Sequence, residues 1–184
     1  MTRLPPPAHL AAMPVRRLVR GFAALLVLAC DGGLEPEPAT ACSAGVVGIC
    51  GTVRFRGAIP ESTDVVYVIA YPSFPQDQSD LFTFQPAAPA TPPILALGDT
   101  IATYELRVPP GRYEWVLAVW KKIGVLNPAT AADLLRESGF YRDPADTSRA
   151  GVVTVAAGGT RDSVDFIVDF DNRHPISYWF PPQR

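Results

Sequence analysis

The sequence predicts an all-β fold, namely a two-sheet sandwich of about seven strands with one short inserted helix. Three observations carry this prediction: short segments in which apolar and polar residues alternate, glycine- and proline-rich turns between them, and a single segment with helix-capping signals. The chain has 184 residues, which suffices for one ordinary domain with tails. We expect the sandwich to span residues 44–172.

Two strands are predicted in the first half of this domain. In residues 49–56 apolar side chains alternate with polar ones, as in a half-buried strand. Residues 65–71 are apolar on both faces and rich in β-branched and aromatic side chains, which predicts a central strand. Residues 72–93 contain six prolines, so they predict a long connection in which residues 81–84 are the one candidate for a short edge strand.

The middle of the domain predicts two more strands. Residues 101–108 resume the alternation, and in the Pro-Pro-Gly turn that follows, Gly111 suits the positive φ of a type II turn. Residues 112–121 then predict a strand that enters the middle of a sheet. Trp120 is expected on the face opposite to the one that lines the core, which would consist of Tyr113, Trp115, Leu117 and Val119.

A short amphipathic helix is predicted over residues 127–139. Asn127 or Thr130 suits its N-cap, Pro128 its first turn, and Gly139 its C-terminal stop. Two strands follow, in residues 151–160 and 162–171. The inward-facing residues of the last strand are expected to be Val164, Phe166, Val168 and Phe170.

The N-terminal residues 1–29 have the layout of a secretory signal peptide. Arginines precede a short apolar run, which ends at a small residue. This run, Gly21–Ala29, is about nine residues long, whereas a helix that spans a bilayer needs roughly 20. No transmembrane helix is therefore predicted. Either Met1 or Met13 could be the start of translation, and Met13 gives the more compact basic region.

The tetrapeptide Val27-Leu28-Ala29-Cys30 resembles the lipobox of bacterial lipoproteins. The resemblance implies that the signal peptide is removed, that the Cys30 thiol carries a diacylglycerol and that its new amine is acylated. An ordinary secretory signal peptide is the alternative. In the lipoprotein case, residues 30–43 would be the lipidated cysteine and a flexible tether. The protein would be anchored to a membrane by lipid in the bacterial cell envelope, facing the periplasm or the cell exterior.

The remaining cysteines and the charge agree with export. Cys42 and Cys50 form an even pair that closes a short loop, so we expect a disulfide; a two-cysteine metal site is the alternative, but histidines near the pair are lacking. All 18 acidic residues follow Cys30, whereas only 12 of the 16 basic residues do. The mature chain would therefore carry a net charge of −6. Nucleic acid is therefore not an expected partner.

Three segments resemble prealbumin-like (transthyretin-like) domains, which are grouped with carboxypeptidase regulatory-like modules. They are GTVRFRGAIPESTDVVYVIAY, YELRVPPGRYEWVLAV and VVTVAAGGTRDSVDFIV. The resemblance implies a seven-stranded Greek-key sandwich of the immunoglobulin/prealbumin-like type that acts as an accessory module without catalysis. Tyr113, two residues after Gly111, is similar to the tyrosine corner of immunoglobulin-like sandwiches, whose hydroxyl bonds back to the backbone. Tyr113, Gly111 and Trp115 are thus expected to determine the fold.

The acidic residues near the C-terminus suggest little chemistry. Asp162, Asp165, Asp169 and Asp171 could be proposed for acid catalysis, but a solvated strand face is the favoured interpretation. Two acidic turns offer weak calcium candidates, Asp143 with Asp146 and Asp169 with Asp171. His174 is the one histidine after Cys30, and no glycine-flanked serine elbow accompanies it. Neither an enzyme nor a cofactor is therefore expected.

Aromatic residues are the remaining binding candidates. Trp120, together with Tyr178, Trp179 and Phe180 in the C-terminal tail (residues 173–184), could stack on a sugar ring or anchor a protein partner. Alternatively, the tail folds back over the sandwich. The sequence therefore predicts a lipid-anchored, non-catalytic interaction or structural module of the envelope, with a carbohydrate-binding module as the alternative and a hydrolase as the third hypothesis. The expected partners are the membrane and an envelope protein or glycan.

Overall fold

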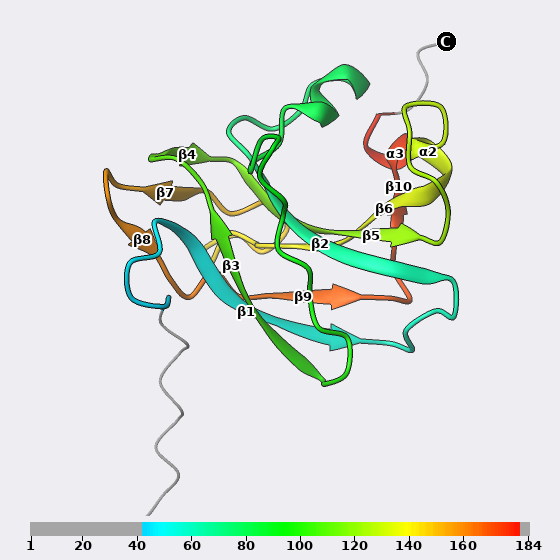
Figure 1. Ribbon diagram of the computed structural model, residues 1–184, viewed down its shortest axis with the longest axis horizontal. Coiled ribbons are helices and arrows are strands. Elements are labelled where there is room, and N and C mark those ends of the chain that lie inside the picture. Colours follow the sequence, from blue (N-terminus) through cyan, green and yellow to red (C-terminus); the bar gives the residue numbers. More distant parts are fainter. Residues whose placement is uncertain (1–41, 181–184) are drawn as a thin grey trace, which may run out of the picture. The chain divides into compact units, whose positions relative to one another are not determined.

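The computed structural model describes residues 42–180, which form a mostly β structure of several sheets (Figure 1). The predicted signal peptide, the predicted lipid-bearing Cys30 and nearly all of the tether lie outside the described residues, as do residues 181–184 at the C-terminus. Within residues 42–180, no helix has both the length and the apolar character that crossing a membrane requires.

The first sheet is built around β1 (Gly48–Arg56). On one side, β1 pairs antiparallel with β3 (Ile101–Arg107). On the other side, it pairs in parallel with β8 (Thr160–Arg161) and β9 (Phe166–Asp169). A strand from the start of the domain thus lies beside one from its end, and the sheet joins residues more than 100 positions apart.

The second sheet has the order β10-β6-β5-β2, with each neighbouring pair antiparallel. Its strands are β2 (Thr63–Tyr71), β5 (Trp115–Lys122), β6 (Leu135–Phe140) and β10 (His174–Pro175). A smaller two-stranded sheet pairs β4 (Gly111–Tyr113) with β7 (Val153–Val155). The predicted all-β class is confirmed, and the arrangement in several sheets is consistent with a sandwich.

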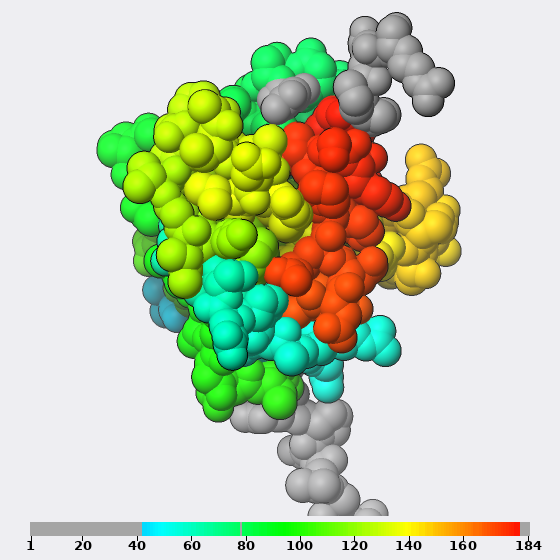
Figure 2. Space-filling view, turned by 90° about the vertical axis from the view of Figure 1, so that its right-hand side faces the viewer, coloured from blue at the N-terminus to red at the C-terminus, as the bar shows by residue number. Residues whose placement is uncertain are grey.

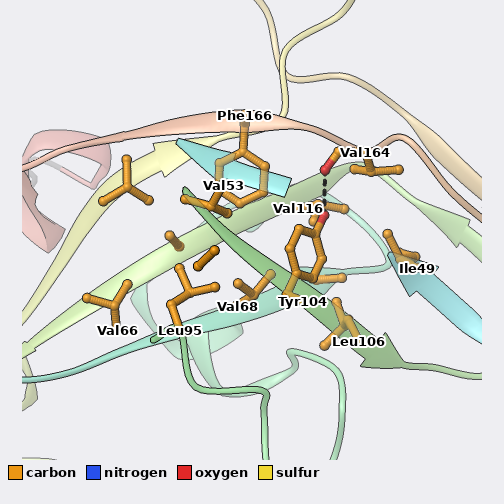
Figure 3. Packing of buried hydrophobic residues seen from close by; sticks show 14 of the residues in the cluster. Ile49, Val53, Val66, Val68, Leu95, Tyr104, Leu106, Val116, Val164 and Phe166 are labelled. Carbon is orange, nitrogen blue, oxygen red and sulfur yellow. Dashed lines mark hydrogen bonds between the residues drawn. The ribbon is translucent and has the colours of Figure 1, made fainter. Parts of the chain in front are cut away.

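An inner cluster of buried apolar side chains lies between the first two sheets (Figure 3). The alternation in residues 101–108 predicts that Ala102, Tyr104, Leu106 and Val108 face inward, and all four belong to this cluster. The inward-facing residues predicted for the last strand belong to it as well, so both predictions are confirmed. Within it, the hydroxyl of Tyr104 donates a hydrogen bond of 2.7 Å to the carbonyl of Val164, which satisfies a phenol that burial would otherwise penalise. The residues labelled in Figure 3 are Ile49, Val53, Val66, Val68, Leu95, Tyr104, Leu106, Val116, Val164 and Phe166.

For most of residues 112–121, the prediction of which side chains point into the core is wrong. The strand is interrupted at Glu114, so that Tyr113 in β4 belongs to the inner cluster while Trp115 in β5 does not. From that break onward the alternation is inverted: Val116, Ala118 and Trp120 face the inner cluster, whereas Trp115, Leu117 and Val119 lie on the outer face. Both faces of β5 are apolar, so alternation alone does not indicate which one meets the other sheet.

The predicted helix over residues 127–139 is also largely wrong. The helix α2 spans only Ala131–Leu134, and residues 135–140 form β6 instead. Gly139 is not a helix stop: a Cβ added there would lie 1.9 Å from the backbone oxygen of Ile167, so glycine lets β6 and β9 approach closely. Pairing with β5 therefore overrides the local helix signals.

The predicted edge strand at residues 81–84 is likewise absent from the structure. Residues Gln78–Phe82 form a 3-10 helix, η2, and the Asp77 side chain caps it by accepting from the backbone N–H of Ser79. An aspartate whose side chain accepts from the N–H groups of the following residues favours a helical turn over a strand. The phenylalanines of this segment therefore project from a turn and not from a ladder.

Two local contacts agree with the sequence predictions, namely the tyrosine corner and the disulfide. The hydroxyl of Tyr113 donates to the carbonyl of Pro109 at 2.7 Å, which is the bond back to the backbone that a tyrosine corner makes. Cys42 and Cys50 form a disulfide with a Cα–Cα distance of 5.4 Å. This disulfide fastens the chain just before β1 to that strand.

Candidate ligand cavity

The sheet β10-β6-β5-β2 carries a second hydrophobic cluster on the face that points away from the first sheet. This outer cluster is rich in aromatic rings: Trp115 lies 5.6 Å from Tyr71, 4.8 Å from Phe74 and 5.2 Å from Trp179, measured between ring centroids. Its buried members are Ile69, Tyr71, Trp115, Leu117 and Phe140. A sheet face of this kind requires a cover, because large apolar patches are rarely left in water.

The proline-rich connection provides part of that cover. Its second half returns along the free edge of β2, where Gln85 and Ala70 exchange two backbone hydrogen bonds of 2.7 and 3.0 Å. Further along, the N–H of Val68 donates to the carbonyl of Pro93. Phe74, Leu81 and Phe84 of the same segment pack against the outer cluster. The connection therefore pairs with the edge strand β2 and also covers part of the outer face of the sheet.

The C-terminal tail covers the other end of this face. After β10 it forms the short helix α3 (Ile176–Trp179), which lies beside α2 (Figures 1 and 2). In the space-filling view the tail is red and the residues around α2 are yellow-green (Figure 2). Trp179 packs into the outer cluster, with its ring centroid 6.0 Å from that of Phe140. The prediction that the tail folds back over the sandwich is confirmed for Trp179.

Between the sheet and these covers lies a cavity of about 400 Å³. Small-molecule sites usually have volumes of roughly 300–1,000 Å³ and mostly apolar walls. Side chains from β2, β5 and β6 form the floor, and side chains from the proline-rich connection, α2 and the tail form the walls. The aromatic residues among them are Tyr67, Tyr71, Phe82, Phe84, Trp115, Trp179 and Phe180.

Most polar side chains in the lining already have partners within the protein. The hydroxyl of Tyr71 donates to the carbonyl of Leu81 at 2.7 Å, and burial raises the pKa of this phenol. The amide oxygen of Asn127 accepts from two backbone N–H groups. The Nη1 of Arg136 donates to the carbonyls of Ala132 and Leu135, at 2.7 Å each. The Tyr71 hydroxyl therefore uses its one donor within the protein, whereas only Nη1 of the Arg136 guanidinium takes part in these bonds.

A carboxylate and an imidazole pair at the tail end of the cavity. His174 Nδ1 lies 2.7 Å from Glu137 Oε2, and both residues line the cavity. The Glu137 side chain is 5% exposed, and desolvation raises the pKa of its carboxyl group, although the hydrogen bond with His174 acts in the opposite direction. The sequence placed Glu137 in a helix, and no local signal connects it with a histidine 37 residues away.

Two buried indole N–H groups in this region have no hydrogen-bond partner among the described residues. They belong to Trp115 and Trp179, which both line the cavity. Trp115 is 2% exposed, so bulk water does not take the place of the missing acceptor. Buried polar groups in folded proteins are nearly always paired, so these two donors are exceptions. Both nitrogen atoms are enclosed by the packed side chains around them and do not face the open volume of the cavity.

The predicted ligand-binding aromatics have different surroundings from one another. The prediction for Trp120 is wrong: it is 4% exposed in the inner cluster, and its Nε1 donates to the hydroxyl of Thr63 at 2.8 Å. Tyr178 is 60% exposed and stacks on the His174 ring at 4.1 Å. Trp179 and Phe180 line the cavity. The tail thus contributes to the site, whereas Trp120 is a core residue.

The acidic turns do not gather into a metal site among residues 42–180, where no group of three potential ligand side chains lies close enough together. Asp143 and Asp146 each accept backbone N–H groups two residues further on, as Asx turns do. Asp169 does the same with Asp171 and also pairs with Arg56 at 3.9 Å. These carboxylates therefore act as turn caps.

The site is thus an apolar, aromatic-walled cavity with an internally paired acid and base and two unpaired donors. These features come from four separate parts of the chain, namely β2 with its long connection, β5, the α2–β6 segment and the tail. Comparisons of the chain with protein-family models, curated proteins and solved structures find no match.

Proposed function

We propose that this protein is a lipid-anchored component of the bacterial cell envelope and that its β-sandwich is a non-catalytic binding module. The cavity on the outer face of β10-β6-β5-β2 is its binding site, and it takes small, predominantly apolar molecules. The observation that carries this proposal is the cavity of about 400 Å³ with predominantly aromatic and aliphatic walls. A cavity of this size and composition is what small-molecule recognition requires.

The anchor is supported by the sequence of residues 1–30 and by the chemistry of the domain. The lipobox-like tetrapeptide ends at Cys30, and the disulfide between Cys42 and Cys50 fits an oxidising compartment outside the cytoplasm. Several acyl chains on one cysteine hold a protein on a membrane far more firmly than a single chain.

The fold proposed here is the seven-stranded Greek-key sandwich of prealbumin-like modules. It is supported by the way the chain alternates between sheets: β1 and β3 lie in the first sheet, β2 and β5 in the second, and β9 returns to pair with β1. The broken pairs β4–β5 and β8–β9 would each count as one strand of that scheme, and the two-residue strand β10 of the tail would lie outside it.

A binding role is favoured over catalysis by what lines the cavity. Among residues 42–180, the lining contains an acid–base pair but no serine, threonine or cysteine that the pair could activate. One observation supports a carbohydrate-binding role, namely that the ring of Tyr178 is exposed and could stack on a sugar. A hydrolase would have to use Glu137 and His174 with a water nucleophile.

The anchor is tested by fractionation of cells that produce Cys30→Ser, with Cys42→Ser as the matched control. We expect Cys30→Ser to leave the membrane fraction and to lose the acyl mass, and Cys42→Ser to remain in the membrane. A Cys30→Ser protein that still sediments with membranes and has an unchanged mass would refute the anchor.

The cavity is tested with the neutral fluorescent probe N-phenyl-1-naphthylamine. Ala131 lines the cavity and is 7% exposed, whereas its neighbour Ala132 is exposed and not part of the lining. Ala131→Phe should therefore weaken probe binding by about tenfold or more, and Ala132→Phe should leave it unchanged. Equal binding by both variants, or no binding by the unmodified protein, would contradict the proposal.

A further inference from the structure

We propose that the docking loop, which we define as residues 122–126 directly after the core of β5, contacts the membrane to which the protein is anchored. This contact turns the opening of the cavity towards the bilayer, so that apolar ligands enter the cavity from the lipid. The inference rests on the anchor and the cavity proposed above. It adds a second, reversible contact with lipid, made by side chains of the folded domain itself.

The opening of the cavity is marked by the lining residues that are exposed. They belong to only two segments among residues 42–180: Phe82 ends η2, whereas Leu126, Asn127 and Pro128 follow β5. Phe82 exposes 64% of its surface and Leu126 exposes 44%. The cavity therefore meets the surface of the protein between η2 and the docking loop.

The docking loop presents three aliphatic side chains to water. Ile123 is 61% exposed, Val125 is 81% exposed, and Leu126 follows directly. Single exposed apolar residues are common on protein surfaces and need no explanation. Three of them within four positions, beside the opening of an apolar cavity, instead indicate a surface that meets lipid or another protein.

The exposure of these side chains does not come from an unattached backbone. The Nζ of Lys121 donates to the carbonyl of Gly124 at 2.9 Å. The hydroxyl of Thr130 donates to the carbonyl of Val125 at 2.8 Å. The side chains are thus presented by a backbone that is already held in place, so the loop loses little conformational entropy when they are buried in a partner.

The charges near the docking loop suit a layer of lipid headgroups. Lys122 is exposed at its base, and no acidic residue occurs in the sequence between Glu114 and Asp133. The other lysine, Lys121, forms an ion pair with Asp64, which compensates that carboxylate. Aliphatic side chains next to an exposed lysine are residues that enter the interfacial region of a bilayer, where the amine stays among the headgroups.

The tether gives the reason to choose a bilayer over a protein partner. It runs from Cys30 to Cys42, so it extends to at most about 40 Å. Roughly 140 residues form a domain with a radius of gyration of about 14 Å, so this length lets any face of the domain reach the membrane. Anchoring also keeps the lipid at a high effective concentration, so a few side chains suffice. A specific protein interface, by contrast, has about 20–30 residues on each side.

The experiment measures the contact in the full, lipidated protein, reconstituted into phosphatidylcholine vesicles. The fluorophore nitrobenzoxadiazole is attached to one added cysteine, while Cys42 and Cys50 are protected by their disulfide. Val125→Cys labels the docking loop, and Phe82→Cys labels the other side of the opening. Val152→Cys is the matched control: Val152 is 46% exposed and precedes β7, which lies at the left of Figure 1, whereas β5 ends at the right.

We expect the labels at positions 125 and 82 to be quenched by nitroxide-labelled phosphatidylcholine at least about twofold more strongly than the label at position 152. Their emission should also lie at shorter wavelength. Ile123→Asp, added to the protein labelled at position 125, should reduce the quenching to the control level, because a carboxylate opposes burial in lipid. Val152→Asp, added to the same labelled protein, should leave the quenching unchanged.

The possible results separate this inference from the proposed anchor. Equal quenching at positions 125 and 152, on vesicles that retain the protein, would overturn the inference and leave the anchor in place. Quenching at position 125 without quenching at position 82 would also overturn it, since the opening of the cavity would then face away from the bilayer. If the protein does not stay with the vesicles at all, both the anchor and the inference are wrong.

Discussion

His174 Nδ1 lies 2.7 Å from Glu137 Oε2, and this contact joins the C-terminal tail to the second sheet next to the cavity. It is reinforced by the backbone pairing of His174 with Glu137 and of Pro175 with Arg136. The pair therefore holds one wall of the cavity in place, and the position of that wall depends on a buried carboxyl group.

The pH dependence of stability tests the burial of this carboxyl group. Because desolvation raises the folded-state pKa of Glu137, the folded state holds its proton more tightly than the unfolded state. The free energy of unfolding should therefore decrease as the pH rises above the ordinary value of 4.5, until the folded-state pKa is passed. Denaturant titrations of the native protein and of Glu137→Gln between pH 4 and 7 should show that the substitution removes this decrease.

Glu105 provides a control of opposite sign. Hydrogen bonds from Ser43 lower the pKa of its exposed carboxyl group, so its contribution is present above pH 4.5 and is lost as the pH falls through the folded-state pKa. Glu105→Gln should therefore flatten the profile on the acidic side. The same pH response in both variants would contradict the assignment of Glu137 as a desolvated acid.

Reduction of the disulfide should destabilise the domain. Cys42 and Cys50 are eight residues apart. The crosslink lowers the conformational entropy of the unfolded chain, which raises the free energy of unfolding by about 2–3 kcal/mol. Denaturant unfolding with and without a reductant should differ by about this amount, and the Cys42→Ser/Cys50→Ala variant should match the reduced protein. A difference below about 0.5 kcal/mol would show that the crosslink contributes little.

Gly139 should tolerate no side chain. A Cβ at this position would lie 1.9 Å from the backbone oxygen of Ile167, so Gly139→Ala must push β6 away from β9. We expect a loss of about 2–3 kcal/mol in the free energy of unfolding, as for other overpacked sites. Gly98→Ala is the control, because a Cβ at that position meets nothing within 4 Å. Equal stability of the two variants would refute the close approach of the strands.

The tyrosine corner can be tested by removing one oxygen atom. Tyr113→Phe deletes the hydrogen bond to the carbonyl of Pro109 and should cost about 1 kcal/mol. Tyr178→Phe also removes a phenol hydroxyl, but from a side chain that is 60% exposed, and it should be neutral within about 0.5 kcal/mol. Thermal and denaturant unfolding of both variants measure the difference.

The contribution of two segments to the inner cluster could be predicted from the sequence because they alternate. In residues 101–108 and 163–170 one face is apolar and the other is polar except for Ile101 and Ile167, so the period identifies the buried face. The same reasoning failed in β5, where both faces are apolar and the break at Glu114 shifts the alternation by one residue. An apolar outer face was the available sign that something covers the second sheet.

The cavity could not be predicted, since its parts come together only in the folded chain. Glu137 and Gly139 were assigned to a helix from sound local signals, and pairing with β5 made them part of a strand. Tyr71 and Trp179 are more than 100 residues apart in the sequence but belong to one cluster. Only the aromatic composition of the tail suggested that it contributes to a site, and two of its aromatic residues, Trp179 and Phe180, line the cavity.

A crystal structure of the protein with bound N-phenyl-1-naphthylamine tests the central claim most directly. The account predicts that the naphthalene ring of the probe lies in the cavity between the second sheet and the C-terminal tail, in contact with the side chains of Trp115 and Trp179. A probe bound elsewhere on the surface, with this cavity closed by the protein's own side chains, would contradict it.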